Sequence, residues 1–176
     1  MASRTGGELV VDSLLAHGAT HVFGVPGESF LPILDALHDV GDRLTFVTCR
    51  QEGGAAYMAE AHGKLAGRPG IALVTRGPGA CNAAIGIHTA AQDSTPMVVL
   101  VGQIDTESVD REAFQEIDYR RMFGSVAKWV AQVDRAERIP EYLSRAFVTA
   151  MSGRPGPVVL ALPEDVLATR ATAADL

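Results

Sequence analysis

The chain has 176 residues, of which 47% are hydrophobic and 20% are charged, and it carries a net charge of −6. This is the composition of an ordinary globular domain, and because Lys and Arg form no cluster, nucleic acid is not an expected partner. The first residues contain no apolar signal core, no apolar run reaches membrane-spanning length and the two cysteines form no CxxC motif, so we expect a single cytoplasmic domain with no membrane partner.

Helical patterns and short apolar strand patterns alternate along the chain. Helices are expected at residues 8–17, 30–40, 53–65, 80–92 and 139–151, with one helical turn at 118–123. Strands are expected at residues 21–24, 44–48, 71–75, 97–101, 126–133 and 158–162. The run at 71–75 is apolar without alternation, which is typical of strands that are covered on both faces.

This alternation predicts an α/β fold with a six-stranded, mostly parallel sheet between two layers of helices. The connections that follow parallel strands meet at one edge of the sheet, where open α/β folds bind their ligands. We therefore expect the turns after Phe23, Thr48 and Thr75 to lie at the same edge.

Glu52 stands at the turn between the second predicted strand and a helix of small residues. A structural role is one interpretation, because the helix dipole stabilises an acidic residue near a helix N-terminus by about 0.3–1 kcal/mol. The other interpretation is a carboxylate that binds a ligand at this edge.

Residues 75–82 (TRGPGACN) predict a tight turn that leads into a helix. The segment differs from a dinucleotide-binding fingerprint, because it follows the third strand and Asn82 stands in place of the third glycine. The side chain of Asn82 could either bond a cofactor or cap the helix, and the sequence does not separate these two roles.

Five motifs, in this order, resemble the N-terminal pyrimidine-binding domain of thiamine-diphosphate enzymes, most closely the acetolactate synthase branch. They are residues 24–28 (GVPGE), 48–55 (TCRQEGGA), 75–82 (TRGPGACN), 113–116 (AFQE) and 152–157 (SGRPGP). The resemblance extends from about Gly6 to Asp165 and implies the thiamine-diphosphate-binding fold, a three-layer α/β/α arrangement. It also implies that residues 1–176 are a single N-terminal pyrimidine-binding domain, which we expect to be part of a longer enzyme.

The resemblance implies that Glu52 is the catalytic carboxylate, bonded to N1′ of the cofactor pyrimidine, a general acid–base role commonly worth ~10²–10⁴-fold in rate. The implied cofactor-binding residues are Pro26, Gly27, Glu28, Glu52, Thr75, Pro78, Gly79 and Asn82. Phe114 and Gln115 are expected on the substrate side, with a buried, loop-anchoring role for the phenylalanine as the alternative. No residue of this chain is expected to bind a metal.

Thiamine diphosphate is the implied cofactor, with Mg²⁺ held by a second domain whose GDG motif this chain lacks, and FAD is left open. The implied reaction is decarboxylation and carboligation of a 2-keto acid. The alternatives are the small subunit of a split 2-keto acid decarboxylase and a non-catalytic oligomerisation module of the same fold. A homodimer or homotetramer with the active site between chains is implied, with the helix at 53–65 in the contact. Its small residues could equally serve packing on its own sheet; they are Ala55, Ala56, Ala59 and Ala61.

Several residues depart from the acetolactate synthase pattern. Glu28 replaces the second glycine of a PGG turn, and Glu164 replaces the lysine of a PKD motif near the substrate entrance. Arg76 and Cys81 replace Ser and Thr of the TSGPGATN motif, which leaves roles of the backbone intact. Residues 104–108 (IDTES) stand where an arginine-containing segment is expected. At Glu28, Glu164 and residues 104–108, groups that would favour an anionic second 2-keto acid are missing or reversed in charge. We therefore predict poor acetolactate formation from pyruvate by the full-length enzyme.

Overall fold

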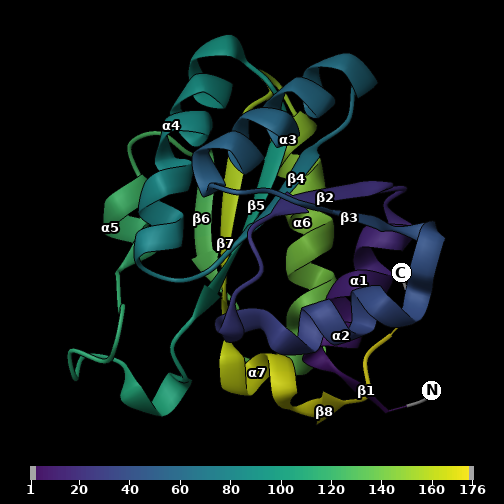
Figure 1. Cartoon of the computed structure of the whole chain (residues 1–176), viewed down its shortest axis with the longest axis vertical. Coiled ribbons are helices and arrows are strands. Elements are labelled where there is room, and N and C mark those ends of the chain that lie inside the picture. Colours follow the sequence, from purple (N-terminus) through teal and green to yellow (C-terminus); the bar gives the residue numbers. More distant parts are fainter. Residues whose placement is uncertain (1–2, 175–176) are drawn as a thin grey trace.

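The central sheet has six parallel strands in the order β3-β2-β4-β5-β7-β6 (Figure 1). The computed structural model describes residues 3–174. The strands of this sheet are β2 (His21–Gly24), β3 (Thr45–Thr48), β4 (Gly70–Val74), β5 (Met97–Gln103), β6 (Trp129–Gln132) and β7 (Pro157–Pro163). The expected six-stranded sheet is therefore confirmed.

Helices cover both faces of the sheet, which confirms the three-layer α/β/α fold (Figure 1). One face is packed against α1 (Gly6–Ala16), α2 (Leu31–Val40) and α6 (Ile139–Met151). The other face is packed against α3 (Glu52–Ala66), α4 (Pro78–Asp93) and α5 (Tyr119–Phe123). Among residues 3–174, no helix has the length and apolar character needed to cross a membrane.

Several short elements were not expected from the sequence. The strands β1 (Arg4–Thr5) and β8 (Arg170–Ala171) pair antiparallel outside the main sheet, and α7 (Glu164–Ala168) follows β7. The described residues also contain four 3-10 helices: η1 (Glu28–Phe30), η2 (Gly41–Arg43), η3 (Thr106–Ser108) and η4 (Ala136–Arg138). Such short elements have little periodicity, so pattern recognition does not find them.

Several predicted boundaries differ from the structure, and two examples show why. The first helix begins at Gly6 rather than at residue 8, because Thr5 and Glu8 form a capping box around the first turn. The strand expected at 126–133 is confined to Trp129–Gln132. The amides of Val126 and Ala127 donate to the carbonyl of Phe123, so this part of the segment closes a turn after α5.

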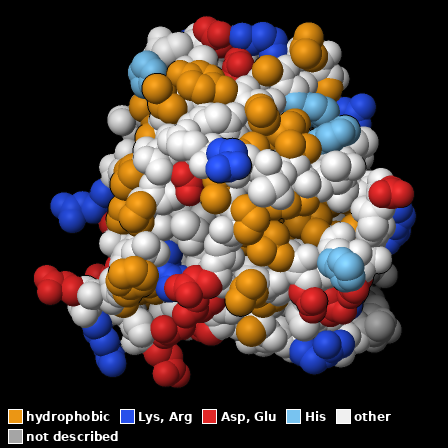
Figure 2. Space-filling view, in the orientation of Figure 1, with side chains coloured by type: hydrophobic (Ala, Val, Ile, Leu, Met, Phe, Trp, Pro, Cys, Tyr) orange, Lys and Arg blue, Asp and Glu red, His pale blue; other side chains and the backbone are white. Residues whose placement is uncertain are grey.

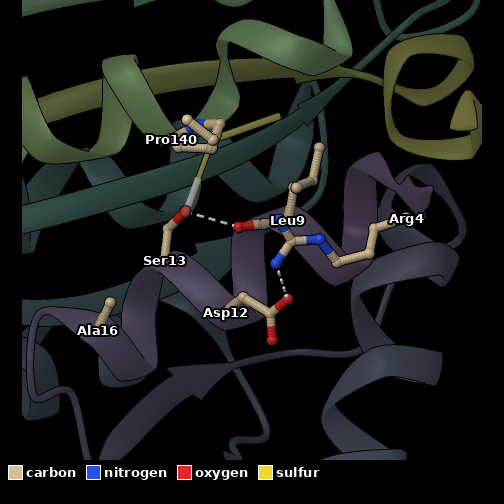
Figure 3. Close-up of a pocket in the computed structure, with 7 residues that line it drawn as sticks. Arg4, Leu9, Asp12, Ser13, Ala16 and Pro140 are labelled. Atoms are coloured by element: carbon tan, nitrogen blue, oxygen red, sulfur yellow. Dashed lines mark hydrogen bonds and ion pairs between the residues drawn. The ribbon is translucent and has the colours of Figure 1, made fainter. Parts of the chain in front are cut away.

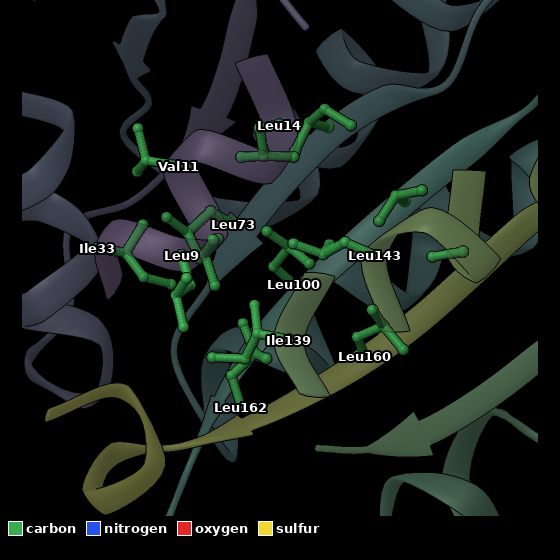
Figure 4. Packing of buried hydrophobic residues seen from close by; sticks show 14 of the residues in the cluster. Leu9, Val11, Leu14, Ile33, Leu73, Leu100, Ile139, Leu143, Leu160 and Leu162 are labelled. Carbon is green, nitrogen blue, oxygen red and sulfur yellow. The ribbon is translucent and has the colours of Figure 1, made fainter. Parts of the chain in front are cut away.

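The core consists of two apolar layers, one on each side of the sheet. On β5, the fully buried side chains of Val98 and Leu100 face one layer and those of Val99 and Val101 face the other. Figure 4 shows the first layer, in which side chains from α1, α2 and α6 lie over the central strands. Each fully buried aliphatic side chain contributes about 1.5–3 kcal/mol to folding. The continuous apolar strands of the sequence are thus explained by burial on both faces.

The small residues of α3 allow close packing inside the domain. A Cβ atom at Gly86 of α4 would lie 2.5 Å from the Cβ of Ala56, and one at Gly70 of β4 would lie 1.8 Å from the carbonyl oxygen of Ala59. Ala55 is also fully buried, whereas Ala61 is exposed. The packing interpretation of these small residues is therefore confirmed for the three buried alanines.

Candidate functional site

The carboxyl ends of the parallel strands bring the sequence-predicted site residues to one edge of the sheet. Because β2 pairs in parallel with both β3 and β4, the turns after Phe23, Thr48 and Thr75 lie side by side, as expected. The amide of Cys49 also donates to the carbonyl of Gly24, which joins the first two turns directly. In Figure 1 this edge lies at the lower ends of β5 and β7, near α7.

Glu52 is the first residue of α3, one position earlier than the predicted start of the helix. The helix begins there because the side-chain oxygen of Gln51 accepts a 3.0 Å hydrogen bond from the amide of Gly54 and caps the first turn. The Glu52 side chain is partly exposed, and its Oε2 accepts a 2.9 Å hydrogen bond from Nδ2 of Asn82. Within residues 3–174 no other side chain donates to this carboxylate, so its second oxygen is available to a ligand.

The helix-capping interpretation of Asn82 is wrong. Helix α4 begins at Pro78, with Gly77 at the N-cap position in a left-handed conformation of φ 59°. Asn82 therefore lies in the second turn, too far along the helix to reach the free amides at its start. Its side chain instead connects α4 to Glu52 of α3.

The turns after β2 and β4 touch each other through glycine. A Cβ atom at Gly27 would lie 2.7 Å from the Cβ of Thr75, and one at Gly79 would lie 2.8 Å from its Cγ2 and 3.4 Å from Oε1 of Glu52. The Thr75 hydroxyl is 2.8 Å from the hydroxyl of buried Ser29, so the turns are also joined by a hydrogen bond. Bare backbone thus borders the Glu52 carboxylate on the Gly79 side.

The segment at 104–118 brings the predicted substrate-side pair to the same edge. Gln115 lies against the turn at Gly77, since a Cβ atom there would be 2.7 Å from the Cβ of Gln115 and 2.9 Å from its carbonyl oxygen. The Phe114 side chain is 73% exposed, so the alternative of a buried, loop-anchoring phenylalanine is wrong for this chain.

Tyr119 holds the turn at Gly77 in place, because its hydroxyl oxygen accepts a 3.0 Å hydrogen bond from the amide of Gly77. Burial raises the pKa of Tyr119 to about 12, which keeps this hydroxyl neutral.

Arg76 has a side-chain role that the sequence did not reveal. It is 6% exposed, and its guanidinium donates to the carboxylates of Glu28 and Glu164 and to the carbonyl of Phe114. One signal in the sequence could have indicated this contact, since these two acidic residues and the arginine all depart from the resembled pattern. Only the backbone roles of this turn were expected from the sequence, and these side-chain contacts of Arg76 were not predicted.

Two further features of the molecule bear on ligand-binding chemistry. In the described part of the chain, no group of three His, Cys, Asp or Glu residues is placed to hold a metal ion. A small pocket of about 90 Å³ lies between α1 and the start of α6 (Figure 3). Its polar groups bond one another, with Arg4 paired to Asp12 at 2.7 Å and the Ser13 hydroxyl donating to the carbonyl of Leu9. This pocket is separate from the Glu52 edge.

Comparison with known proteins places the chain in a family. Residues 4–122 match the family described as "Thiamine pyrophosphate enzyme, N-terminal TPP binding domain". The chain is 47% identical to the acetolactate synthase isozyme 3 large subunit of Escherichia coli K12, over 95% of this chain and 29% of that protein.

Relatives from a yeast and an archaeon show a similar sequence identity and coverage. The mitochondrial acetolactate synthase catalytic subunit of Saccharomyces cerevisiae is 42% identical, over 93% of this chain and 24% of that protein. The probable acetolactate synthase large subunit of Methanocaldococcus jannaschii is 41% identical, over 92% of this chain and 27% of that protein. The chain thus spans about a quarter of the length of these relatives. It belongs to the thiamine pyrophosphate enzymes and corresponds to their N-terminal TPP-binding domain.

Proposed function

We propose that this chain forms the pyrimidine-binding half of a thiamine-diphosphate-dependent enzyme, with Glu52 as the carboxyl group that bonds the cofactor pyrimidine. The observation that carries the proposal is the placement of Glu52 at the carboxyl edge of the sheet, held by Asn82 through a 2.9 Å hydrogen bond. A helix N-terminus alone does not require this arrangement, since the dipole acts on any nearby acidic residue.

The residues around Glu52 fit an aminopyrimidine ring. One carboxylate oxygen is fixed by Asn82, which leaves the other to share a proton with a ring nitrogen. The Gly79 and Gly27 positions bear no side chain, which lets both turns pack closely on Thr75 and brings the backbone of Gly79 beside the Glu52 carboxylate. Pro26, Thr75 and Pro78 belong to the same turns and complete the proposed cofactor-binding surface.

For Glu28 we propose a different role from the one that the resemblance implies. Its carboxylate is bonded to Arg76 at 2.9 Å, so its nearest charged partner is a protein group. We assign it to the substrate side of the site, beside Phe114 and Gln115, and leave binding of the pyrimidine to Glu52.

The proposed reaction of the whole protein is decarboxylation of a 2-keto acid followed by transfer to an acceptor, a lyase or transferase activity of the acetolactate synthase type. Thiamine diphosphate, when bound, supplies the electron sink that this chemistry requires. The role of this chain is to orient the pyrimidine and to hold or move a proton at the Glu52 carboxylate. A separate domain would hold the diphosphate and Mg²⁺, with homo-oligomers placing the site between chains.

A direct test uses the whole protein supplied with thiamine diphosphate and Mg²⁺. We expect release of CO₂ from a 2-keto acid that depends on both additions. Glu52→Gln should lose most of this activity while retaining the fold, and Glu141→Gln, an exposed change on α6, should keep it. Full activity of the Glu52→Gln protein would contradict the proposed role of Glu52.

A further inference from the structure

Arg76 connects the segments that follow four of the strands. It directly follows β4 and Thr75, and its guanidinium donates to Oε1 of Glu28 at 2.9 Å, to Oε2 of Glu164 at 3.0 Å and to the carbonyl of Phe114 at 3.2 Å. Glu28 follows β2, Glu164 follows β7 and Phe114 lies between β5 and α5. A single side chain therefore fixes how these segments lie relative to one another.

The chemistry of this contact requires arginine. A guanidinium presents several N–H groups in a rigid plane, so that it can bond three acceptors at once, whereas the ammonium of lysine is a point charge on a flexible stem. The Arg76 side chain is 8% exposed, while the side chains of Glu28 and Glu164 are 68% and 41% exposed. The positive charge is thus buried and paired, and the two carboxylates face the solvent.

The segment at 104–118 depends on such restraints. Asp110, Glu112 and Gln115 have positive φ angles of 64°, 53° and 66°. Residues other than glycine adopt this conformation at a cost in free energy, and keep it only where the surroundings hold it. The bond from Arg76 to the carbonyl of Phe114, next to Gln115, is one of these restraints.

The same region is strongly acidic. The segment at 104–118 contains six acidic residues and one basic residue, which are Asp105, Glu107, Asp110, Glu112, Glu116 and Asp118 against Arg111. Figure 2 shows the acidic side chains gathered at the lower left, where Figure 1 draws the segment between β5 and α5. With Glu28 and Glu164, they give this side of the site an excess of negative charge.

We propose that Arg76 is a positioning residue that holds Phe114 and Gln115 at the substrate side, and that the acidic surface around it selects an uncharged carbonyl acceptor, of the aldehyde class, over a second 2-keto acid. This inference rests on the proposed function and names its acceptor. A 2-keto acid brings a carboxylate toward Glu28 and Glu164, and like charges in such proximity disfavour binding.

The transfer step is balanced without a further reactant. The donor 2-keto acid loses CO₂, and the carbon that carried the carboxylate forms a bond to the carbonyl carbon of the acceptor. The π bond of the acceptor carbonyl breaks, and its oxygen takes up a proton. An aldehyde acceptor has no carboxylate, so this step brings no additional negative charge to the acidic surface.

The positioning role is tested in the whole protein by hydrogen–deuterium exchange of residues 109–118. Arg76→Lys keeps the charge but cannot bond three acceptors, so we expect faster exchange in this segment. The matched control is Arg154→Lys, because Arg154 also donates three bonds, to Ser94, Ala91 and Gln92, at the far end of α4. Unchanged exchange at 109–118 in Arg76→Lys would overturn the positioning role.

The acceptor preference is tested by competition between acetaldehyde and pyruvate as acceptors, with pyruvate as the donor. The wild-type protein should form mainly the aldehyde product. Replacing both Glu28 and Glu164 by Gln retains hydrogen-bond acceptors for Arg76 but removes two charges, which should shift the product ratio toward the 2-keto acid by about 10-fold. Exchange at 109–118 should stay close to that of the wild type.

The outcomes separate this inference from the proposed function. A wild-type protein that prefers pyruvate as acceptor, or a double variant with an unchanged product ratio, would overturn the acceptor preference alone. A protein without any thiamine-diphosphate-dependent decarboxylation would overturn the proposed function and the acceptor preference with it. The exchange experiment needs no turnover, so it decides the positioning role of Arg76 in either case.

Discussion

Asn82 of α4 donates a 2.9 Å hydrogen bond to the carboxylate of Glu52 at the start of α3. The two residues belong to helices that follow β4 and β3, the strands on either side of β2, and both lie near the carboxyl edge of the sheet. The bond fixes the position of one carboxylate oxygen before any ligand arrives. A site that is held in place in this way loses less entropy on binding.

The first prediction concerns this bond. In Asn82→Ala, Glu52 loses its side-chain donor, and a hydrogen bond to a charged group contributes about 1.5–3 kcal/mol, so we expect activity to fall roughly tenfold. Because both side chains are partly solvated, the lower end of that range applies. His88→Ala, an exposed change on the same helix, is the control and should be neutral. Steady-state rates of the whole protein measure the effect of Asn82→Ala and of the His88→Ala control. Equal rates for Asn82→Ala and wild type would refute the role of the hydrogen bond between Asn82 and Glu52.

The second prediction concerns the contact between α3 and α4. Gly86→Ala would place a Cβ atom 2.5 Å from the Cβ of Ala56, and such overpacking typically costs about 1–3 kcal/mol. Gly54→Ala is the matched control, because no atom lies within 4 Å of its Cβ position and alanine favours the helix by roughly 0.5–1 kcal/mol. Thermal unfolding should therefore show a lower midpoint for the first variant only. A stabilised Gly86→Ala protein would contradict the close packing.

The third prediction concerns pH. The His17 ring stacks on Phe147 at 4.5 Å, and its buried Nε2 has no hydrogen-bond partner among the described residues. Burial lowers the pKa of His17 below its ordinary value of 6.5. The unfolded chain therefore binds a proton near pH 6.5 that the folded chain does not, so stability falls as the pH drops below this value.

His17→Phe should reduce that loss, since phenylalanine can stack on Phe147 but does not titrate. Urea unfolding of wild type and variant at pH 8 and at pH 5.5 measures the difference, and an NMR titration gives the pKa directly. A His17 that titrates at or above 6.5 would contradict the burial of its ring.

The fourth prediction concerns self-association. Tyr57 and Met58 of α3 and Ile85 of α4 are 41%, 48% and 55% exposed, so large apolar side chains lie on the outer side of these helices. We expect Ile85→Glu to weaken the oligomer, which sedimentation would report as a smaller species. The control is Val148→Glu on α6, which is 63% exposed on the opposite face of the sheet. A wild-type protein that is monomeric at high micromolar concentration would count against the prediction.

The layered fold could be predicted because local patterns determine it. The apolar strands and the amphipathic helices carry their periodicity in the sequence, and parallel topology then places Glu52 and Pro78 at one edge. The capping role of Gln51 shifted the start of α3 by one residue only. Elements of two to five residues, such as β1 and α7, have too few positions for any period to appear.

The site was predictable in its position but not in its contacts. Asn82 was found as a polar residue of the turn, yet its partner lies 30 positions away and depends on how α3 packs against α4. Arg76, Glu28 and Glu164 are separated by up to 136 positions, and their pairing exists only once the strand order is known. The opposite charges of Arg76 and of Glu28 and Glu164, all of which depart from the resembled pattern, were the one signal that could have predicted this pairing.

The central claim is that Glu52 activates the bound cofactor, and the most direct measurement is the exchange of the thiazolium C2 proton of thiamine diphosphate with deuterium, followed by NMR. Glu52→Gln keeps the shape of the side chain and an oxygen that can accept from Asn82. Because the proposed separate domain would hold the diphosphate, cofactor binding should largely persist. An amide cannot share a proton with the pyrimidine nitrogen, so we expect exchange to slow by about 10²-fold or more. Exchange at the wild-type rate in the Glu52→Gln protein would contradict the account.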